Sequence, residues 1–284
     1  MLATLEGLDH VVIATDDLDT AAQQWRDLGF VVSPRGVHSA HLGSGNHTIM
    51  LDDDYIELLG ILTPTEHNAP TREFIESRGE GLERFAFRTS NAALGADALK
   101  QRGFASRGPI DFSRPVDLPG GGQGEAAFSV FHWPVSETPA GMRIFACQHR
   151  TRDTVWIPEL LEHPNTACGI NYVEIIAQDP QDAAHHMAHL IDSTAQPLED
   201  GSYRVDSGPG RAYFMYMTKS LFSSRHNIDD NAALPTEGAA ALVLRARSLD
   251  AVARHVGPQA LVQANHVTVP AQRATGVMLV FEQA

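Results

Sequence analysis

The sequence predicts an α+β protein built from four similar β-α-β-β-β modules. A strand followed by a helix recurs four times along the 284 residues, and each recurrence is followed by further strand-like segments. The composition, 43% hydrophobic and 20% charged, can supply a full core. A single module of this kind cannot bury both faces of its strands, so we expect neighbouring modules to share a core.

The first module shows the pattern most clearly. Residues 8–14 are apolar and β-branched, which predicts a strand. Asp17 is a suitable N-cap for a helix over 18–28, where apolar residues recur at the spacing of one helix face. Gly29 stands at the C-cap position, and we expect strands at 30–32, 48–51 and 55–59.

The other modules appear when the chain is shifted along itself. A shift of 74 residues places Gly103 on Gly29, and a shift of 162 places residues 170–175 on the first strand. A shift of 231 places residues 242–244 on residues 11–13. Later strands are expected at 126–133, 142–147, 202–206, 211–218, 266–269 and 276–281. The proline-containing segment 151–166 separates two halves, 1–150 and 165–284.

Charge and cysteine content narrow the function. The formal net charge of −14 disfavours nucleic-acid and anionic-membrane partners, which need a basic face. The two cysteines, Cys147 and Cys168, cannot form a disulfide framework and suit a reducing compartment. The sequence shows neither a signal-peptide pattern nor an apolar run of membrane-spanning length. We therefore expect a cytoplasmic protein.

Residues 8–14, the helix that contains Trp25, Gly29-Phe30 and the strand at 55–58 together resemble a module of the vicinal-oxygen-chelate superfamily. Within it, the chain is most similar to glyoxalase-like domain proteins, best over residues 5–62. The resemblance implies that modules pair into two half-open barrels. It also implies a divalent metal ion held by a His on a first strand and a Glu on a closing strand.

His10 and Glu57 match these two metal positions. By strand alternation, Tyr55, Glu57 and Leu59 share one face, where a carboxylate needs a metal, a cation or water. His149 is the expected third ligand, with His132 as an alternative. The sequence does not distinguish Zn, Fe, Mn and Ni. The position of His10 holds Arg84, Tyr172 and Ala241 in the later modules, and none of these is a good ligand.

The substrate side of the site is expected to be cationic and aromatic. Arg84 and Arg143 interrupt apolar strands, and an inward guanidinium suits a ligand carboxylate. Trp133 and Phe145 are expected to contact the substrate, and Trp25 and Phe131 could line the same cleft.

Two functions remain open. The leading hypothesis is a metal-dependent enzyme of lyase or dioxygenase type, with Glu57 as a catalytic residue, acting on a small molecule with neighbouring oxygens. The alternative is a metal-free protein of the same fold that binds or sequesters a small molecule. Exposed barrel edges are compatible with a homodimer in either case.

Overall fold

A computed structural model describes the whole chain except residues 119–120, 229–233 and 259. The first two modules contain β1 (Leu5–Thr15), α1 (Leu18–Asp27), β2 (Gly36–Val37), β3 (Ser44–Met50), β4 (Tyr55–Ile61), α2 (Ala69–Arg78), β5 (Gly81–Thr89), α3 (Ala92–Gln101), β6 (Arg107–Asp117), β7 (Gln123–His132) and β8 (Arg143–His149). Among the described residues, no helix has the length and apolar character needed to cross a membrane.

The last two modules repeat this order. They contain β9 (Ala167–Ile176), α4 (Pro180–Ile191), β10 (Ala195–Pro197), β11 (Tyr203–Asp206), β12 (Tyr213–Met217), α5 (Lys219–His226), β13 (Gly238–Ala246), α6 (Leu249–Val256), β14 (Leu261–Val262), β15 (His266–Val269) and β16 (Met278–Gln283).

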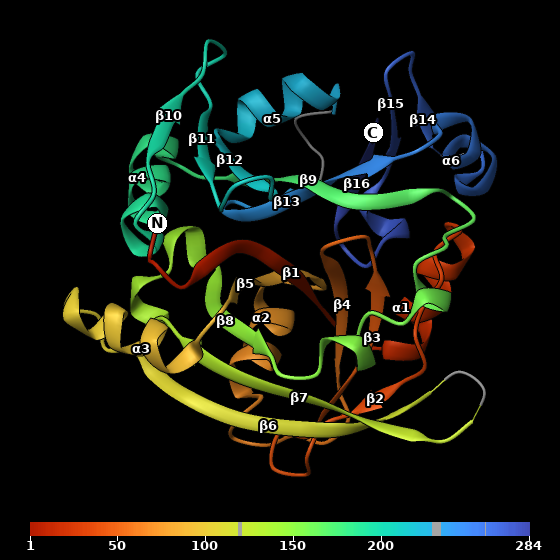
Figure 1. The fold of residues 1–284 in the computed structure, drawn as a ribbon. Helices are drawn as coiled ribbons and strands as arrows, with labels where there is room; N and C mark the ends of the chain where they lie inside the picture. Colours follow the sequence, from red (N-terminus) through yellow and green to blue (C-terminus); the bar gives the residue numbers. More distant parts are fainter. Residues whose placement is uncertain (119–120, 229–233, 259) are drawn as a thin grey trace.

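The strands form two eight-stranded sheets with the same topology. Their orders are β2-β3-β4-β1-β5-β8-β7-β6 and β10-β11-β12-β9-β13-β16-β15-β14. The first strands of paired modules, β1 with β5 and β9 with β13, are antiparallel neighbours at the centre of each sheet. Each sheet curves into a half-barrel, and the long curved strands β7 and β6 form one edge of the first (Figure 1). The predicted α+β fold of paired modules is confirmed.

The main core lies between the two sheets and joins both halves. It contains alternate residues of the central strands and the inner faces of α1, α3, α4 and α6. Trp25 of α1 reaches across to the second half, where its indole N–H donates to Thr275 Oγ1 at 3.1 Å. The opposite face of each sheet, inside each half-barrel, carries a separate and smaller cluster. The site residues lie on this inner face of the first sheet.

Several predicted elements differ from the structure. Residues 30–32 do not form a strand, because the backbone N–H of Val31 is bonded to the ring of His163 and not to a neighbouring strand. The closing strand of the second module continues beyond Cys147 to His149. Helices α2 and α5 were not predicted, and each buries only two side chains.

Candidate site in the N-terminal half-barrel

Two rows of side chains cross the inner face of the first half-barrel. The residues of β1, β4, β5 and β8 that alternate with the core residues point to this face. The register of β4, β1, β5 and β8 places these residues side by side in two rows: Glu57, Val12, Arg84 and Arg143 in the first, and Tyr55, His10, Ala86 and Phe145 in the second. Four of the predicted site residues, His10, Glu57, Arg84 and Phe145, are therefore together.

His10 and Glu57 face each other across β1 and β4. Nε2 of His10 lies 3.7 Å from Oε2 of Glu57, and the other carboxylate oxygen accepts a 2.7 Å hydrogen bond from Asn46. The ring of His10 stacks on Tyr55, with centroids 4.1 Å apart. Burial would raise the pKa of Glu57, but His10, His38, Asn46 and Arg84 outweigh it and lower this pKa. Glu57 is therefore a carboxylate at neutral pH, suited to binding a cation.

Asp9 orients His10 from behind. Its Oδ2 lies 2.8 Å from Nδ1 of His10 and 2.8 Å from Nε2 of His149, and Arg88 Nε donates to Oδ1 at 2.8 Å. Burial would raise the pKa of Asp9, but His149 and His10 hold it well below its usual value. This carboxylate bonds Nδ1 of His10, so Nε2 is the ring nitrogen directed at Glu57.

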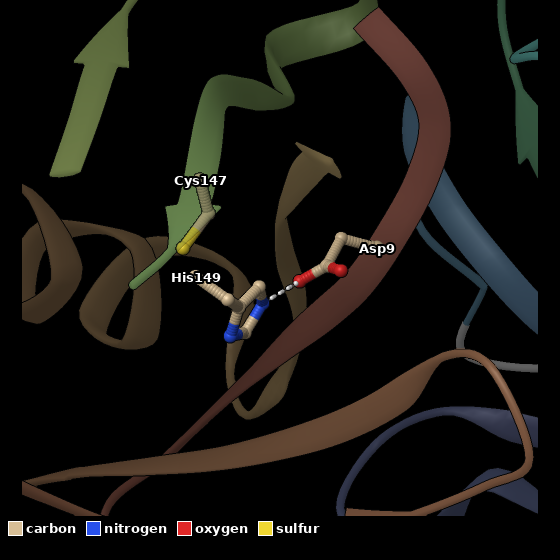
Figure 2. A group of neighbouring side chains, drawn as sticks. All are labelled: Asp9, Cys147 and His149. Carbon is tan, nitrogen blue, oxygen red and sulfur yellow. Dashed lines mark hydrogen bonds and ion pairs between the residues drawn. The ribbon is translucent and has the colours of Figure 1, made fainter. Parts of the chain in front are cut away.

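His149 does not join His10 and Glu57. Figure 2 shows its ring directed from β8 at the carboxylate of Asp9. Asp9, Cys147 and His149 form a group of potential metal ligands, with donor atoms within 4.8 Å of one another in the described part of the chain. Burial raises the pKa of the Cys147 thiol well above its usual value, and Asp9 already has three partners. This group therefore suits a hydrogen-bonded support for His10 better than a metal centre.

Arg84 and Arg143 form a second polar cluster around a buried acid. Glu83, with a side chain only 1% exposed, binds Arg84 through Oε2 and Arg143 through Oε1. The hydroxyl of Thr71, from α2, lies 2.9 Å from Arg84 Nη2 and 2.8 Å from Arg143 Nη2. Both guanidinium groups are thus held in place at one end of the Glu57 row.

Phe145 lies between two histidines. Its ring meets that of His10 edge-on at 5.4 Å and stacks on that of His132 at 5.6 Å. Burial, with Arg84 and Arg107 nearby, lowers the pKa of His132 to about 4, so this ring is neutral at pH 7.

Trp133, in contrast, lies on the opposite face, where it packs in the main core and donates to the carbonyl of Leu190 at 3.0 Å. Trp25 and Phe131 are in the same core and cannot line the site.

The second half-barrel holds different residues at the equivalent positions. Its corresponding rows are Met215, Glu174, Ala241 and Met278, then Tyr213, Tyr172, Val243 and Val280. Methionine or alanine replaces Glu57, Arg84 and Arg143, and tyrosine replaces His10. The buried Glu174 is bound instead by His226 of α5 at 2.5 Å and by Arg225 at 3.3 Å. The chemistry of the first half-barrel is therefore not duplicated at these positions.

Sequence reasoning missed Glu83 and Thr71, and it treated Asp9 only as a neighbour of His10. Asp9 and Glu83 are the extra residues of two β-bulges between β1 and β5, so each points inward beside the residue that follows it. Simple alternation places them on the core face. The sequence feature that could have identified Glu83 and Asp9 is the repeat itself, because a shift of 74 residues aligns Glu83-Arg84 with Asp9-His10.

Comparison with known proteins identifies the family. The profile of a family described as glyoxalase-like domain matches residues 8–191. The chain belongs to this glyoxalase-like domain family, within the vicinal-oxygen-chelate superfamily. The predicted resemblance is thereby confirmed. No curated protein matches the chain significantly.

Two solved structures with TM-scores above 0.5 support the fold of this glyoxalase-like protein. A hypothetical protein from Staphylococcus aureus is 13% identical, with a TM-score of 0.71 over 99% of this chain and 100% of its own. A xylose isomerase-like TIM barrel/4-hydroxyphenylpyruvate dioxygenase fusion protein is 13% identical, with a TM-score of 0.62, and the chain spans 49% of it. Methylmalonyl-CoA epimerase from Mycobacterium tuberculosis is 19% identical, with a TM-score of 0.42 over 54% of this chain and 94% of its own.

The superfamily commonly binds a divalent metal ion, and His10 with Glu57 offers a partial match. An imidazole whose second nitrogen is held by a carboxylate is the usual form of a metal-bound histidine. A separation of 3.7 Å between Nε2 and Oε2 fits two ligands of one ion, since metal bonds of about 2.1 Å place neighbouring ligands roughly 3 to 4 Å apart. The donor types and their orientation therefore fit a divalent ion with two protein ligands.

Proposed function

We propose that the N-terminal half-barrel is an active site for a small molecule with neighbouring oxygens, and that His10 and Glu57 hold a divalent metal ion there. The observation that carries this proposal is the pairing of Nε2 of His10 with Oε2 of Glu57 while Asp9 holds Nδ1. When bound, the ion supplies Lewis-acid chemistry, which polarises substrate oxygens and favours lyase or dioxygenase reactions.

The chain's own residues would prepare and shield this site. Asp9 keeps the Nε2 lone pair of His10 available, and Asn46 fixes one oxygen of Glu57 so that the other faces His10. Tyr55 and Phe145 pack against the His10 ring and limit water around it. Two protein ligands leave several coordination positions for substrate oxygens.

Metal content tests this proposal. Wild-type protein, purified without a metal-affinity tag and soaked with Mn²⁺, Zn²⁺, Ni²⁺ or Fe²⁺, should bind one ion per chain. We expect Glu57→Gln and His10→Ala to lose it. The matched controls Glu159→Gln and His185→Ala, both at exposed positions, should keep it. Unchanged occupancy in Glu57→Gln would contradict the proposal.

One observation favours the alternative of a metal-free binding protein. The residues of the second module at the positions of His10 and Glu57 are Arg84 and Phe145, which are not metal ligands. The paired modules therefore provide only two metal ligands at these four positions. Under this alternative, no metal binds in wild type or variants. Ligands would instead raise the melting temperature of the metal-free protein by mass action.

A further inference from the structure

Two arginines share one buried carboxylate, that of Glu83, inside the first half-barrel. Arg84 and Arg143 share one carboxylate, that of Glu83, and one neutral hydroxyl, that of Thr71. The groups in contact are thus two guanidinium groups and one carboxylate, and the carboxylate of Glu57 acts on Arg84 only at longer range. Each arginine side chain is only 21% exposed, so bulk water stabilises the two guanidinium charges poorly.

The guanidinium groups retain donors for a further partner. Among the contacts of the described residues, Glu83 and Thr71 engage Nε and Nη2 of Arg84 and Nη2 of Arg143. Each guanidinium carries five N–H bonds in a planar fork. Nη1 of Arg84, with Nη1 and Nε of Arg143, can therefore each donate a single charge-assisted hydrogen bond to another anion, such as a carboxylate.

The position of this cluster relates it to His10 and Glu57. Arg84 and Glu57 flank Val12 on β5 and β4, so their backbones lie two strand spacings, or about 10 Å, apart on the same inner face. A molecule of a few carbon atoms can span this distance. The same positions in the second half-barrel are Ala241 and Met278, which bind no anion.

We propose that Arg84 and Arg143, held by Glu83 and Thr71, form an anion clamp that binds the carboxylate of a small organic acid. The other end of that acid, which carries neighbouring oxygens, lies toward His10 and Glu57. The clamp itself stands on the contacts around Glu83, whereas the orientation of the acid rests on the proposed function. The substrate class is thus a small carboxylic acid and not a neutral carbonyl compound.

Titration calorimetry with malonate tests the clamp, with the neutral analogue malonamide as the matched probe. Wild-type protein treated with a chelator should bind malonate and not malonamide. Arg143→Gln should weaken malonate binding at least tenfold, and Arg150→Gln, at an exposed position, should not change it. Because Arg143→Gln leaves Glu83 with one partner fewer and could unfold the protein, Thr71→Val serves as a second variant. It removes only the shared hydroxyl, and we expect a loss of about threefold.

The outcomes separate the two proposals. Absence of malonate binding, or equal binding by wild type, Arg143→Gln and Thr71→Val, overturns the clamp even when His10 and Glu57 bind metal. Malonate binding that depends on Arg143 in a protein that takes up no metal supports the clamp and overturns the metal site. Loss of malonate binding in Arg150→Gln would show that surface charge is responsible, and would also overturn the clamp.

Discussion

Asp9 and Glu83 occupy two β-bulges, 74 residues apart in the chain, and each binds the basic side chain that follows it. Asp9 binds His10 and also His149 of β8. Glu83 in the same way binds Arg84 and also Arg143 of β8. Both modules therefore contain an acid at a bulge that binds two basic side chains, but the basic side chains differ. The first presents an imidazole to Glu57, and the second presents a pair of guanidinium groups.

Replacing Asp9 tests the first of these arrangements. Asp9→Asn removes a buried charge that binds two histidines and Arg88, so we expect the free energy of unfolding to fall by about 2 to 4 kcal/mol. Urea denaturation measures this change. Asp97→Asn, at an exposed position on α3, is the control and should change stability by less than about 0.5 kcal/mol. Equal effects of both variants would show that the Asp9 network contributes nothing.

The buried Asp54 predicts a dependence of stability on pH. Burial, outweighing the hydrogen bond from Ile170 and the nearby Arg211 and Arg245, raises the pKa of Asp54 from 3.8 to about 7. The unfolded chain therefore releases this proton at lower pH than the folded one. The fold consequently loses stability as the pH rises from about 4 to about 7.

Asp54→Asn removes this titration while keeping an oxygen that can accept from Ile170. We expect the stability of the variant relative to wild type to increase by roughly 1 to 3 kcal/mol between pH 5 and pH 8. Urea denaturation at both pH values measures the change, and the exposed Asp53→Asn is the control. A stability difference that stays constant between the two pH values would refute the assignment to Asp54.

The second half supports the bulge that carries Asp9. Arg211, after β11, donates through Nη2 to the carbonyls of Leu8 at 2.6 Å and of Asp53 at 2.7 Å, and Ser207 accepts from the Leu8 N–H at 2.8 Å. A Cβ at Gly7, where φ is +109°, would lie 2.4 Å from Cγ of Arg211. Gly7 therefore permits the close approach of the two halves beside the site.

We expect Gly7→Ala to lower the free energy of unfolding by about 2 to 4 kcal/mol, through backbone strain and the clash with Arg211. Gly103→Ala is a matched control, since its φ of +91° is similar and nothing lies within 4 Å of an added Cβ. It should cost only about 1 kcal/mol. Thermal and urea denaturation measure both losses of stability. The loss in Gly103→Ala reports backbone strain alone, and the excess in Gly7→Ala reports the clash with Arg211. A loss in Gly7→Ala no greater than that in Gly103→Ala would argue against the clash.

The repeated strand-helix pattern predicted the fold because each module buries one face of its strands and one face of its helix. The helix that begins at Leu18 and its counterparts in the other modules follow this rule, and all contribute to the main core. Helix α2 escaped prediction because it buries only Thr71 and Ile75, too few side chains to produce a periodic pattern.

The candidate site was only partly predictable. Glu57 lies on a regular strand, so alternation placed it on the correct face. Asp9 and Glu83 lie at bulges, which reverse the expected face and depend on tertiary pairing of β1 with β5. Trp133 follows β7, and alternation offered no means of deciding that its indole lies in the core against Leu190.

The most direct test of the metal proposal identifies the histidine that binds the ion. Electron spin-echo envelope modulation of the Mn²⁺-loaded protein detects the nitrogen of a coordinated imidazole. We expect modulation from one histidine. It should persist in His149→Gln, which removes a partner of Asp9 but not the metal ligand, and it should be absent in His10→Ala. Modulation that persists in His10→Ala and disappears in His149→Gln would place the ion at Asp9 and His149 instead, and would contradict the pairing of His10 with Glu57 as the metal site.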